Sequence, residues 1–290
     1  MACYTKKTIA FLGAGSMAEA MISGLVKAGI VPANQIIVTN RSNQDRLNEL
    51  EGIYGIRGVK RDDLLFEEVD VFILAMKPKD VERALQSIYD DVKPDQLILS
   101  VLAGISTSYM EQNLRAGQQV IRVMPNTSSM IGESATALSP GKQTTRNNVK
   151  LATDILRCIG EVYLINEEKM DIFTGLAGSG PAYFYYLMEH MEKEGQKAGL
   201  DTETTRQIIA QTIVGAAKMI QEQDETPTEL RENVTSPNGT TAAGLDALDN
   251  FGGGEAISQA VKHASKRSQE ISSQLQKTLL KPEEKKLKAI

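Results

Sequence analysis

The feature that most constrains this chain is a short stretch near its start, residues 8–18 with the sequence TIAFLGAGSMA. Its apolar run predicts a buried parallel strand, and the residues after Gly15 predict the start of a helix. Gly13 can take the sharp turn, Gly15 leaves room for a phosphate beside the backbone, and Ala18 lets helix and strand pack closely. Free N–H groups at the helix start, with the helix dipole behind them, favour a pyrophosphate. The stretch predicts a dinucleotide-binding turn, and the alternative is an ordinary strand-to-helix turn in an α/β protein.

Length and charge limit the classes of protein that remain. With 290 residues, of which 41% are hydrophobic, the chain can form one large domain or two ordinary ones. The net charge is −5, the pI is about 5.3, and no basic stripe is present. Neither nucleic acid nor a membrane surface is therefore expected as a partner.

Cysteine and histidine usage narrows the chemistry further. Cys3 and Cys158 lie far apart in the sequence, so a disulfide framework is not expected. This cysteine usage fits the reducing cytoplasm, which is the expected location. No signal peptide and no apolar run of membrane-spanning length is recognisable. The only histidines are His190 and His263, so neither a metal site nor a Ser-His-Asp triad is expected.

The second predicted strand, Ile36–Thr39, bears on cofactor choice. Enzymes that use NAD usually place Asp or Glu after this strand to accept the ribose 2′-OH. This chain has Asn40-Arg41-Ser42 instead. An arginine can pair with a 2′-phosphate, and its neighbours can donate hydrogen bonds to it. NADPH is the preferred cofactor on this argument and NADH the second candidate, and the alternative is a solvated surface arginine.

Strand and helix signals alternate through the rest of the first half. Apolar runs predict further strands at residues 55–59, 69–75, 96–101, 119–123, 134–138 and 161–165. Helical spacing predicts helices at residues 17–28, 45–51, 79–89 and 145–159. This rhythm is typical of a doubly wound α/β sheet of Rossmann type.

Two of the predicted strands end in residues suited to a cofactor. The strand at residues 69–75 runs into Met76-Lys77-Pro78, and Lys77 either contacts phosphate or ribose or is simply solvated. The strand at residues 96–101 is followed by Ala103 and Gly104, whose small size would let a nicotinamide ring approach. Both lie at the carboxyl edge of the predicted sheet, where such folds bind ligands.

From Glu167 onward only helical periodicity remains, which places a domain boundary near Asn166. We expect a dinucleotide-binding domain at residues 1–166, an all-helical domain at 167–280 and a charged tail at 281–290. Pro181 fits the first turn of a helix, Asp201 fits an N-cap, and Thr226–Glu229 forms a capping box.

The block Ser236-Pro237-Asn238-Gly239-Thr240-Thr241 is a second Gly/Ser/Thr turn that opens onto a helix. One interpretation is helix capping, for which Ser and Thr are favoured in any protein. The other is an anion pocket in which backbone N–H groups hold a carboxylate and hydroxyls lie beside it. The spacing alone does not choose between the two.

Across residues 7–275 the chain resembles the pyrroline-5-carboxylate reductase family, the last enzymes of proline biosynthesis. The resemblance is carried by the blocks FLGAGSMAEA, LAMKPKD, LAGIS, RVMPNT, TGLAGSGPAY and ELRENVTSPNGTTAAGLDAL. The last block contains SP-x-GTT, which is close to a family signature. Asn238 stands where the family more often has glycine, and Asn tolerates the left-handed backbone that glycine takes there.

The resemblance implies roles for individual residues. It implies that the pyrophosphate is bound by Gly13, Gly15, Ser16 and Met17, and the 2′-phosphate by Asn40 and Arg41. It implies that the ribose and nicotinamide are lined by Ala75, Met76, Lys77, Pro78, Ala103 and Gly104. It implies that the substrate is bound by Ser236, Gly239, Thr240 and Thr241. It also implies a helical domain that interlocks with a partner chain, so that a homodimer or an oligomer of dimers builds the active site.

The implied reaction is NADPH-dependent reduction of 1-pyrroline-5-carboxylate to L-proline, by hydride transfer to the imine carbon. No His, Lys or carboxylate lies in the SPNGTT block, so Thr241 is the expected partner of the ring nitrogen. Because a threonine hydroxyl is a poor acid, Thr241 either donates a proton or only orients an iminium that arrives protonated.

Two rival interpretations remain at this point. A reductase of the β-hydroxyacid dehydrogenase kind also begins with G-x-G-x-x-A and ends in helices. Such enzymes carry a catalytic lysine followed four residues later by Asn, and residues 181–194 contain Lys193 without such a pair. The second rival is a regulatory paralogue that binds NADP without turnover, against which the intact SP-x-GTT block argues.

Overall fold

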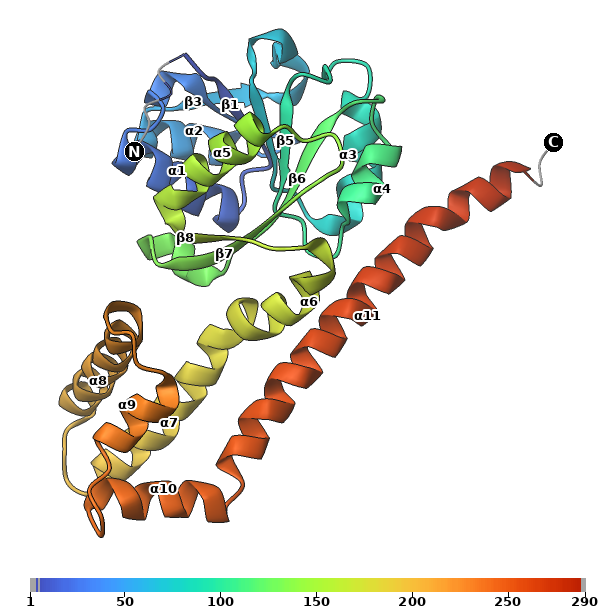
Figure 1. Cartoon of the computed structure of the whole chain (residues 1–290). Helices are drawn as coiled ribbons and strands as arrows, with labels where there is room; N and C mark the ends of the chain where they lie inside the picture. Colours follow the sequence, from blue (N-terminus) through green and yellow to red (C-terminus); the bar gives the residue numbers. More distant parts are fainter. Residues whose placement is uncertain (1–3, 5, 288–290) are drawn as a thin grey trace. The chain divides into compact units, whose positions relative to one another are not determined.

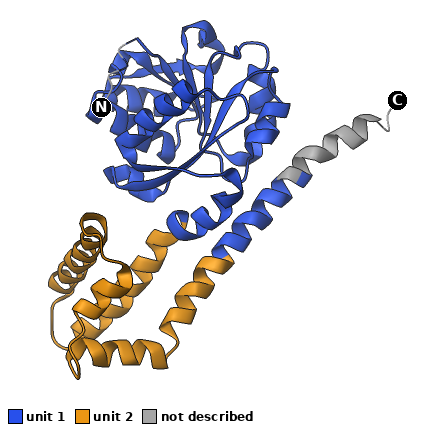
Figure 2. Ribbon diagram, viewed as in Figure 1, with its two compact units in different colours: residues 1–178, 264–290 blue, residues 179–263 orange. Residues whose placement is uncertain are grey.

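The computed structural model describes residues 4 and 6–287, which run through two compact units (Figure 1). The first unit comprises residues 1–178 and 264–290, and the second comprises residues 179–263 (Figure 2). The long helix α11 (Gly253–Leu287) contributes to both.

An eight-stranded sheet organises the first unit. Its strands are β1 (Ile9–Leu12), β2 (Ile36–Asn40), β3 (Arg57–Lys60), β4 (Val71–Leu74), β5 (Leu97–Ser100), β6 (Gln119–Met124), β7 (Ser134–Pro140) and β8 (Gly160–Leu164). Its helices, besides its share of α11, are α1 (Ser16–Ala28), α2 (Gln44–Tyr54), α3 (Val81–Ile88), α4 (Thr107–Gln112), α5 (Arg146–Leu156) and α6 (Met170–Phe173). Short 3₁₀ turns occupy Ala33–Gln35, Arg61–Asp63, Phe66–Glu68, Pro78–Asp80, Thr127–Ile131, Arg157–Ile159 and Glu167–Lys169.

The strand order is β3-β2-β1-β4-β5-β6-β7-β8. Strands β1 to β6 run parallel, and the order reverses between β1 and β4, which are neighbours. This reversal is the topological switch point of a doubly wound fold, where the loops on its two sides diverge and leave room for a ligand. The prediction of a Rossmann-type α/β unit followed by helices is confirmed.

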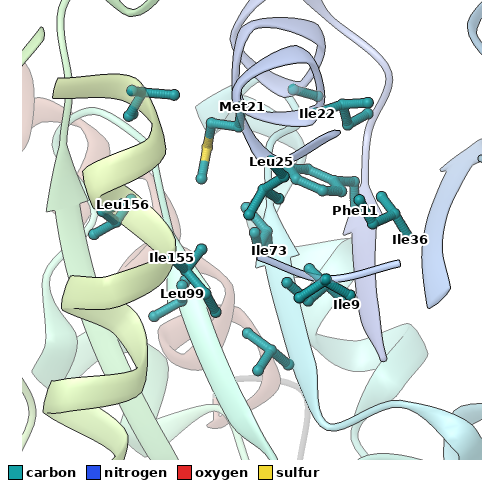
Figure 3. Packing of buried hydrophobic residues seen from close by; sticks show 14 of the residues in the cluster. Ile9, Phe11, Met21, Ile22, Leu25, Ile36, Ile73, Leu99, Ile155 and Leu156 are labelled. Atoms are coloured by element: carbon teal, nitrogen blue, oxygen red, sulfur yellow. The ribbon is translucent and has the colours of Figure 1, made fainter. Parts of the chain in front are cut away.

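Apolar cores cover both faces of the sheet. Alternate residues of β1, Ile9 and Phe11, share one cluster with side chains of α1, α2 and α5, among them Met21 and Ile155 (Figure 3). The intervening residues of β1 belong to a second cluster with α3 and α4. Because every residue of β1 is buried, the strand has no polar alternation, as expected for a central parallel strand.

The second unit is helical throughout. It contains α7 (Gly180–Lys197), α8 (Thr202–Glu222), α9 (Pro227–Asn233), α10 (Thr240–Asn250) and the first part of α11. Asp201 caps α8 by accepting a hydrogen bond from the Thr204 N–H, and Thr226 and Glu229 form the predicted capping box of α9. These local predictions are confirmed.

Four features differ from the sequence-based expectations. Strand β7 runs antiparallel to β6, so the sheet is mixed at that edge. Helix α4 was not expected. Residues Thr174–Gly178 form a π-helical turn that leads into α7, a feature that the helical periodicity did not predict. Helix α11 continues to Leu287, inside the range expected to be a tail, and residues 288–290 of that range lie outside the described residues.

None of the helices within residues 4 and 6–287 combines the length and the apolar character that a bilayer span requires.

Candidate functional site

Four loops meet at the carboxyl edge of the sheet. They follow β2, β1, β4 and β5, which lie side by side in that order. Because the strands are parallel, every residue expected to bind a cofactor lies in one of these loops or directly beside it: Asn40 and Arg41, then Gly13 to Met17, then Ala75 to Pro78, then Ala103 and Gly104. The structure thus gathers residues from four separate segments around the switch point between β1 and β4.

The two glycines of the loop after β1, Gly13 and Gly15, have different environments. At Gly13, where φ is +124°, an added Cβ would lie 2.5 Å from the Ala75 carbonyl oxygen. Glycine is required there so that the turn can pack against the end of β4. At Gly15 an added Cβ would meet nothing within 4 Å, and the residue is exposed. The backbone at Gly15 is therefore open to an incoming group.

Helix α1 begins at Ser16 with Gly15 as its N-cap residue, and no side chain of the described residues caps it. The first N–H groups of a helix have no intrahelical partner. Ser16 is exposed and Met17 half-buried. An uncapped helix start beside an open glycine fits a pyrophosphate, because the N–H groups and the helix dipole both favour negative charge.

The loop after β2 holds the two residues assigned to the 2′-phosphate. Arg41 is exposed and makes no ion pair within the described residues. Asn40 is half-buried, and its Oδ1 accepts a hydrogen bond of 3.4 Å from the Ser42 N–H. The cationic side chain at this position is free to meet an anionic ligand.

The loops after β4 and β5 offer small or flexible side chains. Lys77 is exposed, whereas Ala75, Met76 and Pro78 are half-buried. Ala103 is exposed and Gly104 is buried with φ of +77°. A Cβ at Gly104 would lie 3.0 Å from the Leu275 side chain of α11, so α11 covers one side of this loop.

A polar network that the sequence did not reveal holds the loop after β5. Glu167 accepts hydrogen bonds from the Thr107 N–H (2.9 Å) and hydroxyl (2.5 Å), and it pairs with Arg122 at 3.2 Å. Arg122 is buried on β6, next to β5. Sixty residues separate Thr107 from Glu167, so no local sequence signal connects them.

The residues assigned to the substrate lie in the second unit, at the start of α10. Gly239 is the N-cap residue of α10, and no side chain caps it among the described residues. The hydroxyls of this block therefore do not cap α10, which argues against the capping interpretation. Asn238 has φ of +59°, which confirms the expected left-handed backbone at this position.

Hydroxyl groups surround this uncapped helix start. Ser236 and Thr240 are exposed, and Gly239 and Thr241 are half-buried. None of the four is therefore buried in a core. Within the described part of the chain, the Thr241 hydroxyl has no hydrogen-bond partner. The turn itself is held by its backbone, since the Gly239 N–H donates to the Ser236 carbonyl at 3.0 Å. The block presents free N–H and O–H donors, which suits a carboxylate beside a group that accepts a hydrogen bond.

Two cavities of the described chain lie elsewhere. One of about 210 Å³ is lined by residues that include Lys7, Asp70 and Gln96, near the amino ends of the strands. Another of about 630 Å³ is lined by residues that include Arg61 and Asp91. Neither includes a residue expected at the cofactor or substrate site.

Comparisons with known proteins decide the family. Residues 167–271 match the family described as pyrroline-5-carboxylate reductase dimerisation. Residues 8–104 match the family described as NADP oxidoreductase coenzyme F420-dependent. Pyrroline-5-carboxylate reductase 1 of Bacillus subtilis is 62% identical over 275 residues, which cover 95% of this chain and 93% of that protein. The chain belongs to the pyrroline-5-carboxylate reductase family.

Solved structures of pyrroline carboxylate reductases share the fold over most of this chain. The structure from Coxiella burnetii has a TM-score of 0.84 and 31% identity, covering 92% of this chain and 98% of that one. The structure from Plasmodium falciparum, solved with NADP bound, has a TM-score of 0.82 and 26% identity, covering 93% of this chain and 100% of that one. This pyrroline-5-carboxylate reductase family member therefore matches its relatives through both of its units.

Proposed function

We propose that this chain reduces 1-pyrroline-5-carboxylate to L-proline with NADPH as the electron donor. The observation that carries the proposal is the uncapped, hydroxyl-lined start of α10, in a chain that also presents an open, uncapped glycine turn. Family membership supports the same reaction, and the relative solved with NADP bound supports the cofactor.

On the nucleotide side, this chain's residues bind and orient. Gly15, Ser16 and Met17 offer backbone N–H groups to the pyrophosphate, and Asn40 and Arg41 meet the 2′-phosphate. The loops after β4 and β5 line the ribose and nicotinamide. NADPH supplies, when bound, the hydride that the imine carbon accepts.

On the substrate side, the N–H groups of Thr240 and Thr241 hold the carboxylate of the cyclic imine, with the Ser236 hydroxyl beside them. The Thr241 hydroxyl forms a hydrogen bond with the ring nitrogen. The imine carbon accepts hydride when the nitrogen carries a proton, and the product is then a neutral secondary amine that takes a further proton from water. Orienting the iminium is the role that a poorly acidic hydroxyl can perform.

The decisive assay follows the loss of NADPH absorbance with 1-pyrroline-5-carboxylate as substrate, and NADH in parallel. Turnover with formation of L-proline supports the proposal. Binding of NADPH without turnover would contradict it and favour the non-catalytic paralogue.

Replacing Arg41 tests the cofactor preference. Arg41→Ala is expected to raise the KM for NADPH about tenfold or more, because a charge-assisted hydrogen bond to phosphate contributes about 1.5–3 kcal/mol. The KM for NADH should not change, since NADH lacks the 2′-phosphate. Arg57→Ala is the matched control, an exposed arginine of the same unit that pairs with Glu68. Equal effects on both cofactors would remove Arg41 from 2′-phosphate recognition.

The helical unit supports a homodimer. Ile209 is its only buried large apolar side chain among the described residues. Its exposed large apolar side chains are Phe184, Tyr185, Tyr186, Leu187, Met191, Leu200, Ile208, Val214, Met219, Ile220, Val234, Leu248, Phe251 and Ile257. A surface of this kind marks an interface, and the match to the dimerisation family points to a second copy as the partner.

Phe251 is 92% exposed in the single chain and offers a test of this interface. We expect Phe251→Asp to shift the monomer–dimer equilibrium toward monomer by about tenfold or more, since buried interface aromatics commonly contribute about 2 kcal/mol. Sedimentation equilibrium measures the shift. Tyr89→Asp, at an exposed aromatic of the first unit, is the control. An unchanged equilibrium would place Phe251 outside the interface.

The remaining expectations belong to the same proposal. Residues 1–166 would bind the nucleotide, and residues 167–280 would form the dimer and bind the substrate. The cytoplasm is the proposed location, with neither nucleic acid nor membrane as a partner, on the acidic charge balance and the cysteine usage.

A further inference from the structure

An arginine outside the expected site contacts the glycine turn. Arg46 lies in the first turn of α2, and its Nε donates to the Ala14 carbonyl at 3.2 Å. Its two terminal nitrogens donate to Glu49 at 2.7 Å and to Glu19 of α1. The side chain is 20% exposed. One planar guanidinium therefore makes three directed contacts, one of them to the backbone of the turn.

The turn is held from both sides by the same segment of the chain. The Gly13 N–H donates to the Thr39 carbonyl of β2 at 3.0 Å, and the Ala14 carbonyl accepts from Arg46 of α2. Between these two anchors lies the loop that carries Arg41. That loop ends at Asn43, the N-cap residue of α2, whose side chain accepts a 3.0 Å hydrogen bond from the Arg46 N–H. Arg46 thus connects the two loops expected to meet the phosphates.

Arg46 also pairs with a negative charge at the start of α1, the carboxylate of Glu19. Glu19 lies in the first turn of α1, close to where the pyrophosphate is expected. Besides Arg46, the Tyr54 hydroxyl contacts the Glu19 carboxylate, at 3.2 Å. A carboxylate without a cationic partner there would oppose a bound phosphate, and the Arg46 ion pair offsets that charge.

We propose that Arg46 is a positioning residue for the dinucleotide: its guanidinium holds the Ala14 carbonyl, so that the N–H groups of Gly15, Ser16 and Met17 stay directed at the pyrophosphate. The proposal rests on the proposed function, since it requires a dinucleotide at this turn. Arginine is needed because a lysine ammonium lacks the fork that reaches a carbonyl and two carboxylates together.

Comparing the binding of NADPH with that of NADH distinguishes this positioning role from direct contact with the 2′-phosphate. NADPH and NADH share the pyrophosphate, so loss of the turn's geometry weakens both by the same factor. Loss of a 2′-phosphate contact would weaken NADPH alone. A purely structural role would lower the melting temperature without changing the Kd of either cofactor for the folded protein.

The test measures the Kd of NADPH and of NADH by nucleotide fluorescence for the full chain and for Arg46→Gln. We expect about a tenfold rise for both cofactors, which corresponds to the loss of one or two hydrogen bonds. The KM for the imine and the kcat at saturating cofactor should stay near their original values. Arg57→Gln, which breaks an exposed ion pair of the same unit, should leave both Kd values unchanged.

Arg46→Lys provides a second variant in case Arg46→Gln does not fold. It keeps the charge opposite Glu19 and loses the contact with Ala14, so it should weaken both cofactors severalfold, in equal measure. Unchanged Kd values in the folded variants, or a loss confined to NADPH, would overturn the proposal. Binding requires no turnover, so a chain that binds NADPH but does not reduce the imine would refute the proposed reaction and leave the role of Arg46 standing.

Discussion

Thr241→Val is expected to lower kcat by about a hundredfold and to leave the Kd for NADPH unchanged. Thr241 is the second residue of α10, and its hydroxyl has no hydrogen-bond partner in the described chain. Valine has the same branched shape and nearly the same helix propensity, so the substitution removes one hydroxyl and little else. We assign that hydroxyl to the ring nitrogen, where its hydrogen bond orients the iminium in the hydride-transfer step.

Steady-state kinetics with both substrates varied, together with direct titration of NADPH, separates these effects. Thr212→Val is a suitable control, because the Thr212 hydroxyl donates to the Ile208 carbonyl of its own helix. That variant should keep the original kcat. If Thr241→Val also keeps it, Thr241 has no part in the reaction and the start of α10 only binds the carboxylate.

Gly15→Val is expected to raise the Kd for NADPH about a hundredfold, with the fold retained. At Gly15 φ is −78° and an added Cβ meets no atom within 4 Å, so a larger side chain fits the protein alone. That open space is where we place the pyrophosphate, and a valine side chain would fill it. Losing one or two charge-assisted hydrogen bonds, at about 1.5–3 kcal/mol each, corresponds to such a change in affinity.

Fluorescence titration measures the Kd for NADPH, and thermal unfolding without cofactor measures the fold. Gly52→Val is the matched control, because Gly52 lies on α2 with no atom within 4 Å of an added Cβ. Gly13→Ala would not serve, since its Cβ would clash with the backbone at Ala75 and destabilise the protein itself. A Gly15→Val protein that binds NADPH normally would move the cofactor away from this turn.

Predictions that depend on residues close in sequence were confirmed. The capping box at Thr226 and Glu229 and the N-cap at Asp201 involve partners three residues apart, so local rules suffice. The strand cores were located by their apolar runs, because buried parallel strands have no polar alternation. The left-handed backbone at Asn238 was expected from the glycine that the family usually has there, and Asn tolerates that conformation.

Features that depend on distant partners were not predicted. Helix α4 is six residues long, and its first N–H is held by Glu167 from far along the chain. The antiparallel pairing of β7 with β6 is a matter of chain direction, which an apolar run does not encode. No sequence signal pointed to Arg46, because its side chain contacts Ala14 of the glycine turn, thirty-two residues away in the sequence.

The sequence by itself determined the fold class, the order of the two kinds of structure along the chain, and the residue types at each candidate loop. These follow from periodicity, glycine geometry and capping, all of which act over a few residues. Only the tertiary structure decided that four separate loops meet at one switch point, that Gly15 is open while Gly13 is packed, and that no side chain of the described residues caps α10. Those properties depend on what lies opposite each residue in space, and that is set by strand order and packing across the whole sheet.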